Sequence, residues 1–227
     1  VYLSHQNDSL RQQFPFLAAD VPKALPLAQE AFGNLPDAVN LWVGDGRSLS
    51  STHKDHYENM YGVIRGTKLF TLLPPCDAPF LNERPFPSAT HRFDHVKGQW
   101  SVDLDQEGQT VNWIDTEVST SRRPGQGKFS FASPVTATVH RGEVLYLPAM
   151  WYHQVEQRGE TIAINFWHDM QFDCKYVMIQ FIRNLYVGPP RQSGDVAVQD
   201  PRDLNDERSG GVEEKQKREG EDDEETV

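Results

Sequence analysis

A chain of 227 residues, of which 37% are hydrophobic, is long enough to form one domain with a substantial core. Its formal net charge of −11 and the lack of a basic cluster argue against a nucleic-acid-binding protein. No apolar run reaches 18 residues and no signal peptide opens the chain, so we expect neither a membrane span nor secretion. The two cysteines, Cys76 and Cys174, lie too far apart to suggest a disulfide framework, which favours the cytoplasm, or the nucleus as well.

The chain changes character several times along its length. Residues 8–36 carry helical stretches punctuated by prolines, and short strands are expected from about Ala38 to Pro75. Residues 76–134 are rich in Pro, Gly, Ser and charge and show little periodicity. We interpret this segment as an insertion that frames a substrate entrance, or else as a variable loop. Strands return from Ala137 to Trp167, and a helix is expected over residues 172–186.

The motif His53-Lys54-Asp55 is the first candidate for chemistry. Read as one strand over residues 52–65, its side chains alternate between two faces, so that His53, Asp55, Asn59 and Tyr61 share one of them. Two imidazoles and one carboxylate can hold iron(II) and leave positions open for other ligands. His56 and Glu58 form a similar pair on the opposite face, which we interpret as solvated or supporting rather than metal-binding.

A basic residue is expected on the same face as this motif. Arg65-Gly66 is typical of a hairpin turn, and a two-residue loop would pair Val63 with Lys68. Directly opposed residues share a face, so Lys68 would enter the side of the metal ligands. A cation there suits a dianionic cosubstrate that chelates the metal at one end and presents a carboxylate at the other.

The third ligand is expected from a later part of the sheet. Residues 144–156 form a strand that contains His153, preceded by a strand over 137–140 across a turn at Arg141-Gly142. A further strand over 161–167 would follow a three-residue loop, with Gly159 in the left-handed conformation, and this register sets His153 opposite Asn165. A core histidine bonded to backbone is the alternative interpretation of His153.

Several separated motifs carry a family resemblance. They are the run from His53 to Asn59, Lys68, the run from Gly142 to Pro148, Trp151-Tyr152-His153, and Ile164-Asn165-Phe166-Trp167. Together they resemble the JmjC family of iron(II)- and 2-oxoglutarate-dependent oxygenases. The chain most resembles the small JmjC-only lysyl hydroxylases, whose substrates are GTP-binding proteins. The resemblance runs from Val1 to about Tyr186 and implies that an N-terminal part of the domain precedes Val1.

The resemblance implies roles for individual residues. His53, Asp55 and His153 match the metal ligands, and Lys68 matches the residue that pairs with the distal carboxylate of 2-oxoglutarate. The other matching residues line the cosubstrate pocket: Asn59, Asn165, Tyr2, Ser50 and Tyr61. Ser50 stands where the family pattern has Thr but keeps the hydroxyl, and Trp167 matches an aromatic wall. With Fe(II), 2-oxoglutarate and O2 bound, family chemistry yields succinate, carbon dioxide and a hydroxylated substrate.

The expected fold is a double-stranded β-helix, a cupin-like jelly roll with flanking α-helices, over residues 1–188. Residues 189–227 hold 13 acidic and 6 basic residues, which predicts an acidic disordered tail and leaves a net charge of −4 for the domain. The helix over 172–186 is apolar on more than one face, so it either packs on its own barrel or forms a homodimer contact.

The residues are compatible with three functions. The first is hydroxylation of a protein side chain, with lysine as the expected target. The second is demethylation of N-methyl-lysine by the same chemistry. The third is a non-catalytic cupin-like binding module, against which the complete set of His53, Asp55, His153 and Lys68 argues.

Overall fold

The computed structural model describes residues 2–4, 7–105, 109–114 and 127–187. The acidic tail expected over 189–227 lies outside these ranges. Within them, none of the helices has both the length and the hydropathy needed to cross a bilayer.

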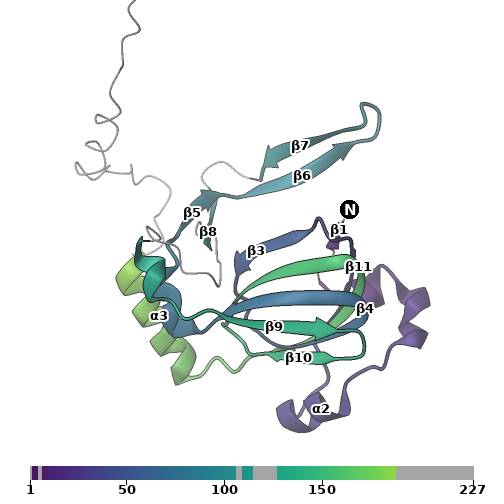
Figure 1. The fold of residues 1–227 in the computed structure, drawn as a ribbon, viewed down its shortest axis with the longest axis horizontal. Helices are drawn as coiled ribbons and strands as arrows, with labels where there is room; N and C mark the ends of the chain where they lie inside the picture. The colour runs from purple at the N-terminus through teal and green to yellow at the C-terminus, as the bar shows by residue number, and fades with distance from the viewer. Residues whose placement is uncertain (1, 5–6, 106–108, 115–126, 188–227) are drawn as a thin grey trace, which may run out of the picture. The chain divides into compact units, whose positions relative to one another are not determined.

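Short helices open the chain and a longer helix closes the described part (Figure 1). The α-helices are α1 (Ser9–Gln12), α2 (Pro26–Phe32) and α3 (Cys174–Val187), and the 3-10 helices are η1 (Pro15–Asp20), η2 (Pro75–Phe80) and η3 (Gly127–Phe131). The strands are β1 (Tyr2–Ser4), β2 (Ala38–Gly44), β3 (Leu49–His53), β4 (Tyr57–Leu73), β5 (Glu83–Pro87), β6 (Ala89–Asp94), β7 (Gln99–Leu104), β8 (Thr110–Ile114), β9 (Val135–His140), β10 (Val144–Leu147) and β11 (Tyr152–Asp169). The helix expected over 172–186 is confirmed as α3.

Two long antiparallel strands, β4 and β11, form the spine of the main sheet. The first half of β4 pairs with β10 and with the second half of β11, which in turn pairs with β2. The second half of β4 pairs with β9 and with the first half of β11, which also pairs with β3. Each long strand therefore belongs to both halves of the structure.

The two halves face each other because β4 bends. Tyr61 and Phe70 are nine residues apart, a distance of about 30 Å along a straight strand, yet their ring centroids lie 5.1 Å apart. The bend falls at Gly66, where φ is +77° and an added Cβ would lie 2.3 Å from the carbonyl oxygen of Glu160. The opposing strand is irregular at the same level, between Arg158 and Ile162, and Gly159 also has a positive φ.

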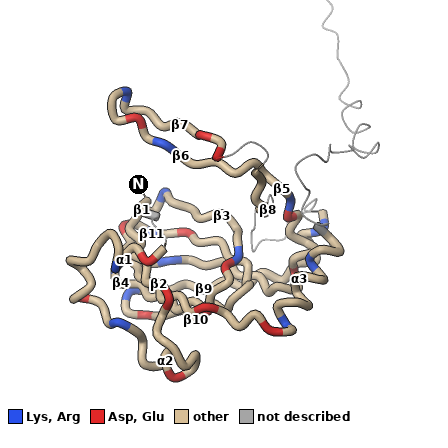
Figure 2. The backbone as a smooth tube through the Cα atoms, turned by 180° about the vertical axis from the view of Figure 1, so that it is seen from behind, with Lys and Arg blue, Asp and Glu red and all other residues tan. Residues whose placement is uncertain are grey.

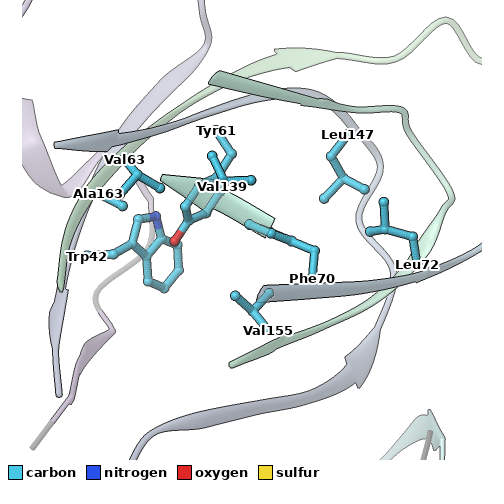
Figure 3. Packing of buried hydrophobic residues seen from close by; sticks show 9 residues of the cluster. All are labelled: Trp42, Tyr61, Val63, Phe70, Leu72, Val139, Leu147, Val155 and Ala163. Atoms are coloured by element: carbon cyan, nitrogen blue, oxygen red, sulfur yellow. The ribbon is translucent and has the colours of Figure 1, made fainter. Parts of the chain in front are cut away.

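A hydrophobic core fills the space between the halves (Figure 3). Its members come from both: Trp42, Tyr61, Val63, Phe70, Leu72, Val139, Leu147, Val155 and Ala163. A second cluster lies on the outer surface of β2, β4 and β11, where α1 and α2 contribute Leu10 and Ala28. This arrangement confirms the predicted cupin-like, mainly β fold with flanking helices.

The expected hairpins at Arg65-Gly66 and at 158–160 are wrong. Both segments are kinks within continuous strands, so Lys68 pairs with Gln157 and Val139 rather than with Val63, and His153 pairs with Leu72 and His53 rather than with Asn165. A glycine with positive φ permits either a reversal or a kink, and the partner strand decides between them. The kink at Gly66 shifts the inward–outward alternation of β4 by one residue. Odd-numbered residues such as Val63 point inward before it and even-numbered ones after it, so Lys68 is still buried on the interior side.

The single strand expected over 52–65 is also wrong. β3 ends at His53, and β4 begins at Tyr57. β3 pairs with the first half of β11, whereas the start of β4 pairs with the second half. The chain therefore crosses from one half of the sheet to the other at residues 54–56, and Asp55 lies on this crossing.

The described part of residues 76–134, a segment expected to be irregular, contains four strands. β5 pairs with β8 and β6 pairs with β7, and Ser88 connects the two ladders through hydrogen bonds with Gln109 and Asp105. The sequence hid this ribbon because Pro85, Pro87 and the charged residues weaken the alternation of hydrophobic residues. Figure 2 shows acidic and basic positions interspersed along the described chain.

Candidate metal centre

His53, Asp55 and His153 come together at one end of the core. His53 is the last residue of β3, Asp55 lies on the crossing to β4, and His153 is the second residue of β11, paired with His53. One ligand atom from each side chain lies within 4.8 Å of the other two. Asp55 Oδ2 is 3.6 Å from His153 Nε2 and 4.0 Å from His53 Nε2.

Both imidazoles are held from behind by backbone carbonyls. His53 Nδ1 lies 2.7 Å from the carbonyl oxygen of Ser51, and His153 Nδ1 lies 3.1 Å from that of Trp151. A carbonyl only accepts, so each Nδ1 carries the proton and each Nε2 keeps a free lone pair directed toward Asp55. This is the orientation that a metal-binding imidazole requires.

Electrostatics keep His153 neutral. Burial lowers the pKa of His153 well below its usual value, the neighbouring His53 acts in the same direction, and Asp55 opposes both. A neutral imidazole offers its lone pair to a metal without first losing a proton. Two imidazole nitrogens with one carboxylate oxygen form a donor set that suits iron(II).

A cavity of about 300 Å³ opens beside these three residues. Its polar lining includes five other residues that the sequence singled out: Tyr2, Ser50, Asn59, Tyr61 and Asn165. Trp42, Phe70, Leu147 and Val155 supply its apolar wall. Eight of the nine predicted site residues therefore line one cavity, and the ninth, Lys68, lies next to it.

Lys68 is fully buried, and its Nζ has no hydrogen-bond partner among the described residues. Nζ lies 5.1 Å from the ring centroid of Tyr2 and 5.8 Å from that of Tyr61. Burial lowers the pKa of Lys68 to about 8. A buried ammonium without an anionic partner is costly, so an anionic ligand in this cavity would satisfy an existing electrostatic need.

Three hydroxyl groups of the cavity lining are connected by hydrogen bonds. Tyr2 is hydrogen-bonded to Ser50 and to Tyr61, and its ring stacks on Trp42 at 6.0 Å. Burial raises the pKa values of Tyr2 and Tyr61, so both phenols remain protonated donors at neutral pH. β1, which carries Tyr2, is attached to β2 at the edge of the sheet.

The two predicted amides behave differently. Asn165 accepts a 3.0 Å hydrogen bond from Trp42 Nε1 through its carbonyl oxygen, which leaves its NH2 group as the donor for a ligand. Asn59 Oδ1 is buried and unpartnered within the described residues. Trp167 lines the cavity, stacks flat on Tyr57 at 4.6 Å, and also has an unpartnered buried Nε1.

Sequence reasoning missed Trp113. This residue of β8 lies parallel to His53, with ring centroids 5.8 Å apart and an interplanar angle of 6°. Its Nε1 donates to Ser51 Oγ at 3.2 Å, and its ring lines the cavity. A tryptophan within a weakly patterned, proline-rich segment was the only signal that the sequence offered.

The rival pair His56 and Glu58 has other contacts. Glu58 Oε2 accepts hydrogen bonds from Tyr146 Oη and from the backbone N–H of Ala149. The ring of His56 lies near those of Phe172 and Tyr176. Glu58 therefore connects β4 to the segment after β10, and His56 contacts the start of the C-terminal helical region.

Fold and site together define a double-stranded β-helix protein with a possible metal site of two histidines and one carboxylate. A family model described as "Cupin-like domain" matches residues 1–174. The chain is 40% identical over 195 residues to "Lysine-specific demethylase JMJ32" of Arabidopsis thaliana, covering 81% of this chain and 56% of the relative. It is 38% identical over 185 residues to human "Bifunctional peptidase and (3S)-lysyl hydroxylase JMJD7", covering 82% and 58%. It is also 39% identical over 201 residues to "JmjC domain-containing protein E" of Dictyostelium discoideum, covering 80% and 57%.

The chain belongs to the cupin-like domain family and, within it, to the JmjC proteins. It spans less than two thirds of the length of these three relatives.

Proposed function

We propose that this chain is an iron(II)- and 2-oxoglutarate-dependent oxygenase that hydroxylates a protein side chain, with a lysine of a GTP-binding protein as the substrate. In this reaction one atom of O2 enters succinate, which forms with loss of CO2, and the other becomes the new hydroxyl group. The observation that carries the proposal is the buried Lys68 ammonium, which has no hydrogen-bond partner in the described part of the chain and lies beside the cavity lined by His53, Asp55 and His153.

The residues present fit both groups. His53, Asp55 and His153 would hold the iron, which supplies the activation of O2 when 2-oxoglutarate is bound. Lys68, Tyr2 and Ser50 would hold the distal carboxylate through one ammonium and two hydroxyl groups.

The amides and the apolar wall complete the proposed pocket. The NH2 group of Asn165 is oriented by Trp42 and would donate to the metal-chelating end of the cosubstrate, beside Asn59. The apolar wall of Phe70, Leu147 and Val155 would exclude water from the reacting end.

Mass spectrometry of a lysine-containing peptide tests this proposal. The peptide, taken from a developmentally regulated GTP-binding protein, is incubated with the chain, iron(II), 2-oxoglutarate, ascorbate and air. We expect a gain of one oxygen on lysine that requires 2-oxoglutarate and is lost in His153→Ala. Succinate release without peptide oxidation would mean an oxygenase with another target.

Demethylation of N-methyl-lysine is the second candidate, favoured because the Arabidopsis relative is named a lysine-specific demethylase. The same cavity would place an N-methyl group, rather than a carbon of the lysine side chain, at the reacting position. A methylated version of the same peptide separates the two reactions. Release of formaldehyde with a loss of 14 Da would indicate demethylation, whereas a gain of 16 Da would indicate hydroxylation.

A non-catalytic binding module is the third candidate. It predicts no succinate under any condition, together with measurable binding of 2-oxoglutarate or of a peptide. Lys68 would bind 2-oxoglutarate in an enzyme and in a binding module alike. Succinate release is therefore the measurement that separates the two.

We also propose a homodimer through α3. Five apolar side chains of this helix, Val177, Met178, Phe181, Ile182 and Leu185, are exposed. Continuous exposed apolar surface of this kind is uncommon on a monomer. Phe181→Glu is expected to halve the mass measured by light scattering. Phe16→Glu, at a similarly exposed position in η1, is the matched control.

A further inference from the structure

One buried carboxylate behind the candidate metal centre binds donors from three separate parts of the chain. Lys54 Nζ lies 3.1 Å from Glu83 Oε1, and Tyr152 Oη donates to Glu83 Oε2 at 3.3 Å. Arg183 of α3 donates through Nε to both oxygens, at 3.0 and 2.9 Å, and through Nη2 to Oε1. The Glu83 side chain is 2% exposed, so these three residues supply most of its polar surroundings.

Two of the donors are sequence neighbours of the candidate ligands. Lys54 stands between His53 and Asp55, and Tyr152 precedes His153. Successive side chains of β11 point to opposite faces, so His153 lines the cavity while Tyr152 packs in a separate cluster on the other side. Glu83 is therefore attached to a position one residue away from each ligand.

The carbonyl oxygens of Asp55 and His56 accept backbone hydrogen bonds from Met150 and Met170, and Lys54 precedes them on the crossing. Residues 54–56 cross between the two halves of the sheet and belong to neither β3 nor β4. Strand ladders therefore do not hold Lys54, and a side-chain anchor takes their place. The Lys54 ammonium, which also lies 4.9 Å from the ring centroid of Tyr152, is 15% exposed and points away from the cavity toward Glu83.

Glu83 and its partner Arg183 lie on two further elements, the β5–β8 ribbon and α3. Glu83 opens β5 and pairs with Ile114, and the next pair along the ribbon contains Trp113, which stacks on His53. Arg183 lies on α3 and is 14% exposed. The ribbon and the C-terminal helix are thus both tied to the segment that carries the candidate ligands.

We propose that Glu83 is a positioning residue for the metal site. Glu83 binds Lys54 and Tyr152 on the side away from the cavity, and Arg183 binds Glu83. These three contacts fix the backbone that carries the three candidate ligands. This inference rests on the proposed function, because it requires that those three residues bind a metal.

Manganese(II) affinity of the full chain, measured by electron paramagnetic resonance without 2-oxoglutarate, provides the test. Glu83→Gln keeps the shape of the side chain and removes its charge, and we expect it to weaken Mn(II) binding by roughly ten-fold or more, the scale seen when groups behind metal ligands are removed. Asp77→Asn is the matched control. Asp77 is also buried and bonded, to the backbone N–H of Ser133, and neither Lys54 nor Tyr152 is among the partners seen for it.

Three further variants keep the test decisive if Glu83→Gln folds poorly. The double variant Glu83→Met with Arg183→Met replaces an ion pair by apolar side chains of similar length, a change that proteins often tolerate, and leaves Lys54 without its anchor. Because Lys54 loses its partner, Mn(II) binding is measured well below the variant's own melting temperature, where the chain is folded, and it should be weak. Arg183→Lys should retain more Mn(II) affinity than Arg183→Met, because only the lysine keeps a cation beside Glu83.

The outcomes separate this inference from the proposed function. Normal Mn(II) affinity in both Glu83→Gln and the double variant would overturn the role of Glu83 and leave the metal site intact. Equal weakening in Asp77→Asn would overturn it as well, since the effect would then follow stability alone. No Mn(II) binding by the unaltered chain would overturn the metal site and this inference together.

Discussion

Trp113 stacks on His53 across 60 residues of sequence, with the two rings 5.8 Å apart and nearly parallel. His53 is one of three candidate metal ligands, and Trp113 belongs to a ribbon inserted between strands of the main sheet. The insertion therefore contributes directly to the wall of the site.

Trp113→Ala is expected to lower the kcat/KM for the peptide roughly three- to ten-fold, the scale of a lost aromatic contact. The KM for 2-oxoglutarate should change little, because Trp113 is not among the residues proposed to bind the cosubstrate. Hydroxylated peptide and succinate are measured in the same reaction, and we expect the variant to form more succinate for each peptide hydroxylated. Trp113→Phe should restore the ratio of the unaltered protein. Trp100→Ala, an exposed tryptophan of β7, serves as the control.

His153→Ala is expected to abolish metal binding and succinate formation. The imidazole is one of three candidate donors, and its removal leaves only His53 and Asp55. Mn(II) titration and succinate release are the two readouts. His140→Ala removes an exposed histidine of β9 and should change neither. Normal succinate formation by His153→Ala would disprove the assignment.

Lys68→Ala is expected to raise the 2-oxoglutarate requirement while Mn(II) still binds. The loss of a charge-assisted contact costs roughly 1.5–3 kcal/mol, or on the order of ten- to a hundred-fold in affinity. Titration of succinate formation against 2-oxoglutarate gives the shift. Lys97→Ala, which alters an exposed lysine, is the control. An unchanged titration would remove Lys68 from the cosubstrate site.

Lys68→Met is expected to stabilise the protein while impairing 2-oxoglutarate binding. In the folded chain the lysine pKa falls to about 8 from an ordinary 10.5, so folding opposes its protonated form. The unfolded chain therefore binds more protons between these values, and the stability of the unaltered protein rises as pH increases through this window. The advantage of Lys68→Met, about 1–3 kcal/mol, should be complete below pH 8 and shrink above it. Thermal melts at pH 7 and pH 9.5 measure this, and a variant less stable than the unaltered protein at pH 7 would contradict it.

The sequence by itself identified nine residues that lie in or beside the cavity of the candidate site. His53, Asp55 and His153 are of the types that bind iron(II), and the alternation of strand residues favoured Asn59 and Tyr61 on the same side. Asn59 and Tyr61 share a side because both lie on β4, where the alternation holds, whereas the single strand expected to join them to His53 and Asp55 is wrong. The mainly β fold followed from the same periodicity and from the resemblance.

The tertiary structure alone decided how these residues meet. Gly66 and Gly159 permit positive φ, but only the pairing of β4 with β11 makes each of them a kink rather than a turn. That pairing, and not a hairpin, brings Lys68 to the cavity. Trp113 and Glu83 contact the site through a ribbon whose prolines conceal its strands. Contacts between residues distant in sequence depend on the packing of the whole chain, which local propensity does not encode.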